Sequence, residues 1–292
     1  MKKLVIVVVV ILFLFFLPFL YREKTEECEY FIEVEGEKEP LDLEEYVKGV
    51  ISAEMPVAYD LEALKAQAIA ARTYVLKSTN YGQIPIEAST RKQVFKNEQQ
   101  REEGWKEKTK EYEAKLDKAV KETKGQILTF NDELITAMFH ASSNGQTESA
   151  ENYGGTAYPY LQSVSSPEEA ITTVSFTIAE LNEKLSSSFT VQHWANAEMI
   201  KNSSGRVETL IVGNKQWSGR EVRTLLELKS TDFRIGIKEG KISFTMSGYG
   251  HGVGMSQVGA NELAKKGSNA EDILAHYYKG TTLNKLNCTK NE

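Results

Sequence analysis

The sequence predicts an α+β fold, in which helices are mixed with a largely antiparallel sheet. Two helices are expected between residues 41 and 81, because apolar residues recur there at helical spacing. A hairpin is expected at 126–139, where two apolar runs flank a short polar turn. Alternating runs predict further strands at 206–212, 233–235 and 242–246. The chain has 292 residues, which is enough for a substantial core.

Charge and cysteine content exclude several classes of protein. The formal net charge of −6 argues against a nucleic-acid-binding face, which would be basic. The two cysteines, Cys28 and Cys288, are too few for a disulfide-dense scaffold or a cysteine zinc cluster. They flank the main part of the chain, so one disulfide between them and two free thiols are both open.

The first residues have the composition of a membrane segment. Lys2 and Lys3 precede an apolar run from Leu4 to Leu20, and no small-residue cleavage site follows it. We therefore expect residues 1–22 to be a transmembrane anchor, or an uncleaved signal. Residues 23–40 would form a tether. Residues 41–290 would form one extracytoplasmic domain of a single-pass protein in the cell membrane.

The first helix of the domain carries a candidate proton donor, Glu54. Asp42 is placed to cap this helix, and Pro56 ends it because a proline disfavours helical geometry in the residue before it. Glu54 continues the apolar stripe into the last turn. Burial and the helix C-terminus both raise the pKa of a carboxyl group there, which favours a general acid. The alternative is a carboxylate at the rim of the core, paired with a basic residue.

The second helix is expected to begin after Asp60 and to end near Gly82. Its many alanines make one surface thin, so another backbone can approach closely. Arg72 lies far enough along it to reach back toward Glu54. It could be a structural ion-pair partner, or it could orient Glu54 or bind a substrate oxygen.

A charged segment follows at 97–124, rich in Lys, Glu and Gln with a narrow apolar stripe. We expect a largely solvated helix there, and a partner-binding helix is the alternative. Further along, 175–185 has a helical pattern. Ser218 with Glu221, and Ser268 with Glu271, form capping-box patterns that predict two more helix starts.

Two loops are candidates for binding groups. The hairpin leads into a run of small polar residues from His140 to Glu148, which is either a binding loop or an ordinary polar turn. The second loop is the glycine-rich run from Gly248 to Gln257, which frees the backbone for close approach. Its spacing fits neither a dinucleotide-binding loop nor a serine-hydrolase elbow.

Three stretches of this chain, in order, resemble the family of stage II sporulation protein D and amidase-enhancer-like domains. The first is Val50–Pro56 followed by Leu64–Tyr74, the second is His140–Glu148, and the third is Gly248–Gln257. The family usually continues the third stretch with tyrosine, where this chain has Val258. The resemblance covers roughly residues 41–286.

The resemblance implies two lobes around a glycan-binding groove and a lytic transglycosylase that needs no cofactor. The enzyme would cut the β-1,4 bond between N-acetylmuramic acid and N-acetylglucosamine in denuded peptidoglycan strands and leave a 1,6-anhydro end. Glu54 would be the catalytic residue. The groove would be lined by Arg72, His140, Ser143, Asn144, Gly145, Gln146, Tyr249, Gly250, His251, Gly252 and Gln257.

The resemblance also implies a setting and a competing class. The protein would act in engulfment during sporulation, in the mother-cell membrane facing the forespore septum, beside stage II sporulation proteins M and P. The alternative is a non-catalytic protein of the amidase-enhancer type that binds peptidoglycan or a partner. Some family members carry cysteine and histidine near the second stretch with zinc-like spacing. This chain has Ser142 and Ser143 at those positions, so we predict no metal.

Overall fold

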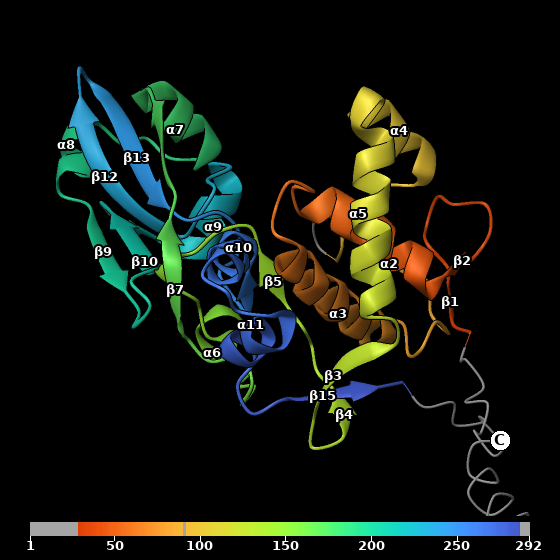
Figure 1. Ribbon diagram of the computed structural model, residues 1–292. Helices are drawn as coiled ribbons and strands as arrows, with labels where there is room; N and C mark the ends of the chain where they lie inside the picture. Colours follow the sequence, from red (N-terminus) through yellow and green to blue (C-terminus); the bar gives the residue numbers. More distant parts are fainter. Residues whose placement is uncertain (1–28, 90–91, 287–292) are drawn as a thin grey trace, which may run out of the picture. The chain divides into compact units, whose positions relative to one another are not determined.

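Helices and small sheets are mixed along residues 29–89 and 92–286, the part of the chain that the computed structural model describes (Figure 1). The α+β prediction is confirmed, while the two lobes remain a prediction. The helices are α2 (Leu43–Glu54), α3 (Leu61–Ser78), α4 (Glu98–Trp105), the 3₁₀ helix η1 (Lys106–Lys108), α5 (Thr109–Glu122), α6 (Ala150–Gly154), α7 (Ile178–Lys184), α8 (Val191–Ala195), α9 (Gly219–Leu225), α10 (Gln257–Lys265) and α11 (Ala270–Tyr277).

The strands are short and pair mainly antiparallel. They are β1 (Phe31–Ile32), β2 (Leu41–Asp42), β3 (Gln126–Phe130), β4 (Glu133–Leu134), β5 (Phe139–His140), β6 (Asn144–Gln146), β7 (Ser165–Glu169), β8 (Ile171–Phe176), β9 (Glu198–Lys201), β10 (Val207–Val212), β11 (Lys215–Ser218), β12 (Asp232–Lys238), β13 (Lys241–Ser247), β14 (Met255–Ser256) and β15 (Thr282–Lys285). The three-stranded sheets have the orders β12-β13-β8, β11-β10-β9 and β15-β3-β4. The pair formed by β5 and β14 is parallel.

Residues Tyr30 to Lys285 form one compact unit. Strand β1 pairs with β2, so the second half of the expected tether is folded onto this unit. The predicted boundaries at 22, 40 and 290 remain predictions.

Helix α3 lies at the centre of the helical part of the fold. It packs against α2, α5, α10 and α11 and against strand β3. This is possible because its alanines are completely buried and add little width, so these elements and strand β4 can all approach one helix. The predicted cap of α2 is confirmed: the Asp42 side chain accepts hydrogen bonds from the backbone N–H groups of Glu44 and Glu45.

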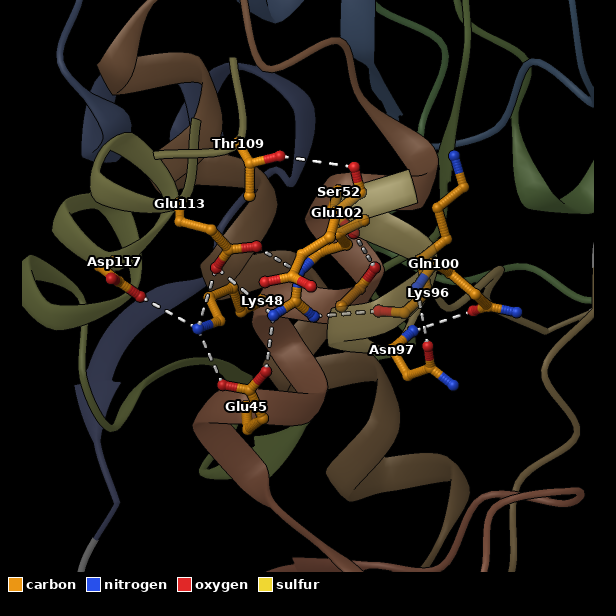
Figure 2. A network of polar contacts seen from close by, with 12 residues as sticks. Glu45, Lys48, Ser52, Lys96, Asn97, Gln100, Glu102, Thr109, Glu113 and Asp117 are labelled. Atoms are coloured by element: carbon orange, nitrogen blue, oxygen red, sulfur yellow. Dashed lines mark hydrogen bonds and ion pairs between the residues drawn. The ribbon is translucent and has the colours of Figure 1, made fainter. Parts of the chain in front are cut away.

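The charged segment folds as α4, η1 and α5 rather than as one helix, with a break at Lys106, whose φ is +52°. Its apolar stripe is buried against α2 and α3. Figure 2 shows Lys48 of α2 among Glu45, Glu113 and Asp117, at 3.0, 3.3 and 3.1 Å. Arg101 of α4 is almost completely buried and pairs with Glu45 and Glu113. This network joins α4 and α5 to α2.

A cluster of buried apolar side chains between residues 181 and 246 packs two of the sheets against short helices. It draws on α7, α8 and α9 and on strands β10, β12 and β13, and includes the buried Trp194. The predicted strands at 206–212, 233–235 and 242–246 are confirmed as β10, β12 and β13. The expected helix at 175–185 is wrong at its start, because Ser175 and Phe176 end strand β8, which pairs with β13.

The expected membrane location is corrected by the structure. Across residues 29–89 and 92–286, no helix has both the length and the apolar character needed to cross a bilayer. The apolar run from Leu4 to Leu20, on which that expectation depended, lies outside the described residues. Cys28 and Cys288 also lie outside them, so their pairing stays open.

Candidate functional site

A pocket of about 670 Å³ brings residues from all three resembling stretches together. Glu54 reaches it from the end of α2, His140 from β5, and Gln257 from the start of α10. The glycine-rich loop contributes Tyr249, Gly250 and His251. The remaining lining residues are Tyr74, Lys92, Val94, Met138, Phe139, Ala141, Tyr153 and Arg223.

Glu54 is half-buried at the pocket wall and is held by two donors. The backbone N–H of Val94 donates a hydrogen bond of 2.7 Å to Oε1, and the side chain of Gln257 donates another. Burial raises the pKa of the Glu54 carboxyl above its ordinary value of 4.5, although both hydrogen bonds act in the opposite direction. The raised pKa agrees with the expectation from the sequence, and burial is its main cause.

Arg72 does not lie where the sequence analysis placed it in the groove. Its side chain is completely buried, and it pairs with Glu44 in the first turn of α2 through two of its nitrogens, with 3.0 Å between Nε and Oε1. Its Nη1 donates a 3.1 Å hydrogen bond to the carbonyl of Gln126. Arg72 is absent from the pocket lining. The substrate-binding role of Arg72 stays a prediction, and the contacts in the structure are those of the structural ion pair that was the alternative.

Backbone pairing holds the two loops of the pocket together. Phe139 and His140 of β5 lie beside Met255 and Ser256 of β14. Beyond this pair, the N–H of Ser142 donates to the carbonyl of Tyr249 at 3.0 Å, and the N–H of Tyr249 donates back at 2.8 Å. The second and third resembling stretches, which are far apart in sequence, thus form one wall of the pocket.

Two glycines permit this close approach. Gly250 has a φ of +111°, and a Cβ there would lie 2.9 Å from the Cβ of His140. Gly254 has a φ of +73°, and a Cβ there would lie 1.9 Å from the carbonyl oxygen of Met138. Both positions therefore require glycine for conformation and for space.

The two histidines of the site are neutral near pH 7. Burial, together with the charge of nearby Arg206, holds the pKa of His140 well below its usual value, and His251 adds to the shift. Burial and the charge of Arg223 lower the pKa of His251 to about 4. The Nδ1 atom of His251 accepts a 3.1 Å hydrogen bond from the Val253 N–H, so its proton is on Nε2. Both rings are held by protein partners: Nδ1 of His140 lies 3.2 Å from the Val253 carbonyl oxygen, and His251 also hydrogen-bonds to the backbone of Phe139. They line the pocket without adding charge.

The other predicted groove residues lie outside the pocket lining. The Ser143 hydroxyl donates to the Gln146 carbonyl at 2.7 Å, and Nδ2 of Asn144 donates to Asp232 at 2.9 Å. These hydrogen bonds hold the loop in place. Gln146 is exposed, and no atom lies within 4 Å of the position that a Cβ would occupy at Gly145. The carbonyl of Gly252 accepts a 2.7 Å hydrogen bond from the N–H of Glu148.

The pocket also contains residues that the sequence analysis did not single out, notably Tyr153 of α6 and Arg223 of α9. The capping box of Ser218 and Glu221 predicts helix α9, and the structure confirms it. No pattern indicated that Arg223, in the last turn of this short helix, faces the same space as Glu54. Residues 29–89 and 92–286 contain no group of three histidine, cysteine or acidic side chains placed to hold a metal ion.

Comparisons with known proteins identify relatives of this chain. The family described as stage II sporulation protein matches residues 34–130. Stage II sporulation protein D of Bacillus subtilis strain 168 is 38% identical over 269 residues, which covers 87% of this chain and 78% of the relative. The protein of the same name from Bacillus amyloliquefaciens is 38% identical over 257 residues, covering 84% and 75%. The amidase enhancer of Bacillus subtilis strain 168 is 28% identical over 298 residues, covering 81% of this chain and 40% of the relative.

Proposed function

Because this chain belongs to the stage II sporulation protein D family, we propose that it is a lytic transglycosylase acting on peptidoglycan during sporulation. Its substrate would be glycan strands already stripped of stem peptides. The bond cut would be the β-1,4 bond after N-acetylmuramic acid. The observation that carries this proposal is Glu54, a half-buried carboxyl with a raised pKa at the wall of a pocket.

One carboxyl can perform both proton transfers of this reaction. Protonated Glu54 donates its proton to the glycosidic oxygen as the bond from that oxygen to C1 of N-acetylmuramic acid breaks. The Glu54 carboxylate then takes the proton of the C6 hydroxyl on the same sugar, and O6 bonds to the oxocarbenium-like C1. The proton that left Glu54 is restored and no water is consumed. Glu54 is the only carboxylate among the described residues lining the pocket, which fits such a scheme.

The neighbouring groups suit the intermediate steps. The Val94 N–H and the Gln257 side chain stabilise the carboxylate that forms when Glu54 gives up its proton. Neutral His140 and His251 are held by protein partners and line the pocket without adding charge. Tyr249, 48% exposed, can present its ring to the face of a sugar.

Turnover of purified denuded glycan tests the proposal directly. Mass spectrometry should find products ending in 1,6-anhydro-N-acetylmuramic acid, each lighter by one water than the corresponding hydrolysis product. Glu54→Gln, analysed in parallel, should give none. Products with ordinary reducing ends would indicate a hydrolase instead.

A second candidate function is a non-catalytic binder that stimulates a partner enzyme. The similarity to the amidase enhancer supports it, although this chain spans 40% of that relative's length. In this case the pocket would hold glycan or a partner segment without cutting it. The same turnover assay separates the two, because a binder would retain denuded glycan and release no fragments.

The finer setting is also part of the proposal. The protein would contribute to engulfment, acting beside stage II sporulation proteins M and P. Co-purification from sporulating cells tests these partners. Recovery of neither protein with the tagged chain would contradict this part without affecting the chemistry.

A further inference from the structure

The pocket around Glu54 carries positive charge in the state needed for catalysis. Among its described lining residues, the cationic side chains are Lys92 and Arg223, and Glu54 is the only acid. His140 and His251 are neutral. When Glu54 is protonated, as a general acid must be, the two cations have no charge opposing them within the lining. Such a pocket favours a substrate that brings an anionic group.

Arg223 lines the pocket without a carboxylate partner among the described residues. It lies half-buried in the last turn of α9, close enough to Tyr153, Tyr249 and His251 to interact with them electrostatically. Its Nε donates a 3.3 Å hydrogen bond to the carbonyl of Leu228. Within residues 29–89 and 92–286, no carboxylate forms an ion pair with it.

Two buried arginines of this fold have carboxylate partners, whereas the buried Arg206 donates from Nη2 to the Gln146 carbonyl at 3.1 Å. Arg72 is paired with Glu44, and Arg101 with Glu45 and Glu113. Burying a guanidinium removes it from water, and a carboxylate normally offsets that cost. Arg223 faces an open pocket instead, with its two terminal nitrogens directed to no protein acceptor that the described residues provide.

We propose that Arg223, assisted by Lys92, binds the lactyl carboxylate of N-acetylmuramic acid. This inference rests on the proposed function and adds a reason for the choice of substrate. The lactyl carboxyl is a free anion only when the stem peptide has been removed; in an intact strand it is a neutral amide. A guanidinium matches a carboxylate in a bidentate geometry and gains much less from an amide. Arg223 would therefore act as the residue that distinguishes denuded strands.

The test compares two strands that differ only at this group. One is denuded glycan with free lactyl carboxylates, and the other is the same material with those carboxylates converted to neutral methylamides. The wild-type protein should cleave the free acid with a kcat/KM about 10- to 100-fold higher, the range expected for a hydrogen-bonded charge pair. Arg223→Gln should remove most of this preference, and Lys92→Gln part of it.

A matched control comes from the same helix. Arg220 also belongs to α9, but it lies over the ring of Tyr153 at 4.2 Å and lines a different pocket, of about 780 Å³. Arg220→Gln should keep the preference for the free acid. Arg223→Lys keeps the charge and should retain an intermediate preference, which covers the case that Arg223→Gln does not fold.

Two results would overturn the inference: an unchanged preference in Arg223→Gln, or an equal loss in Arg220→Gln. Failure of the proposed function is a separate outcome. If the wild-type protein cleaves neither strand, calorimetric binding of the two strands replaces turnover. Tighter binding of the free acid by wild type, lost in Arg223→Gln, would then support carboxylate recognition in a protein that does not cleave.

Discussion

The backbone N–H of Val94 donates a 2.7 Å hydrogen bond to Glu54 Oε1, so a main-chain group orients the proposed general acid. The segment that carries Val94 is itself fixed. The Gln93 side chain accepts a 3.0 Å hydrogen bond from the Tyr46 hydroxyl, and the Lys96 N–H donates to the Gly49 carbonyl at 3.2 Å. Both partners belong to α2, the helix that ends with Glu54. The acid and its donor are therefore held by the same helix.

Glu54→Gln should remove cleavage while leaving the fold intact. Glutamine keeps the shape of the side chain but cannot transfer the proton, and general acid–base catalysis is typically worth ~10²–10⁴-fold in rate. Fragment release from denuded glycan measures the loss, and thermal unfolding checks the fold. Wild-type turnover in this variant would contradict the catalytic assignment, and an unfolded variant would favour a structural role for Glu54.

The pH dependence of turnover should show a limb set by Glu54. The reaction needs the protonated carboxyl, so the rate falls as pH rises through a pKa that burial has placed above its ordinary value. Gln257 stabilises the charged form and lowers this pKa. Gln257→Met should therefore move the limb to higher pH. A limb that stays in place in this variant would exclude Gln257 as a partner of the carboxylate.

Stability should decrease on acidification because of His251. Its pKa is lowered to about 4 in the folded protein from an ordinary value of 6.5, since burial disfavours the charged ring. The unfolded chain therefore binds a proton at higher pH than the folded chain. The contribution to folding stability is fully present above 6.5 and is lost as pH falls toward 4. Urea unfolding between these values should show a shallower decrease for His251→Gln. An equally steep decrease in the variant would contradict the assignment of this pH dependence to His251.

Arg72→Ala should destabilise the fold. Removing one partner of a buried ion pair typically costs about 3–5 kcal/mol, because the remaining charge is left uncompensated. Here the remaining charge is Glu44, at the start of α2. The double variant Arg72→Met with Glu44→Gln should recover part of the loss. Chemical denaturation measures both. A normal unfolding midpoint for Arg72→Ala, combined with weak glycan binding, would restore the substrate-binding interpretation.

Two glycines of similar conformation give a matched test of the pocket wall. Gly145 and Gly250 have φ of +94° and +111°, but only Gly250 has a neighbour at its Cβ position. Gly145→Ala should cost about 1–3 kcal/mol from strain alone. Gly250→Ala should cost more and also reduce turnover, because the new methyl group displaces His140. Equal losses for both variants would mean that the contact with His140 is unimportant.

Local signals predicted the elements that depend on local chemistry. Asp42 caps α2, Ser218 with Glu221 begins α9, and Glu54 lies half-buried at a helix end with a raised pKa. Each follows from a few neighbouring residues. The last predicted cap is shifted by one residue: Asn269 with Asp272 begins α11, rather than Ser268 with Glu271. Both pairs have the same spacing, so the pattern alone does not distinguish them.

The features that the sequence did not predict depend on contacts between residues that are far apart along the chain. Arg72 was correctly placed on a helix, but its partner Glu44 is 28 residues away, and no local pattern favours it over Glu54. The second hairpin strand was expected to run to Phe139. It is limited to Glu133–Leu134, and Phe139 pairs with Met255 instead. The sequence also did not predict that Arg223 lines the pocket, because this depends on which pocket its helix faces.

The contact between β5 and β14 also sets the order in which the pocket can form. His140 and Val253, which meet beside this pair, are 113 residues apart along the chain. Closing such a long loop is slow compared with forming α2 and α3, which are neighbours in sequence. During refolding, the helical signal should therefore return before the glycan cleavage proposed for this pocket. The delay between the two signals would measure how long the C-terminal half of the chain takes to join α2, the helix that carries Glu54.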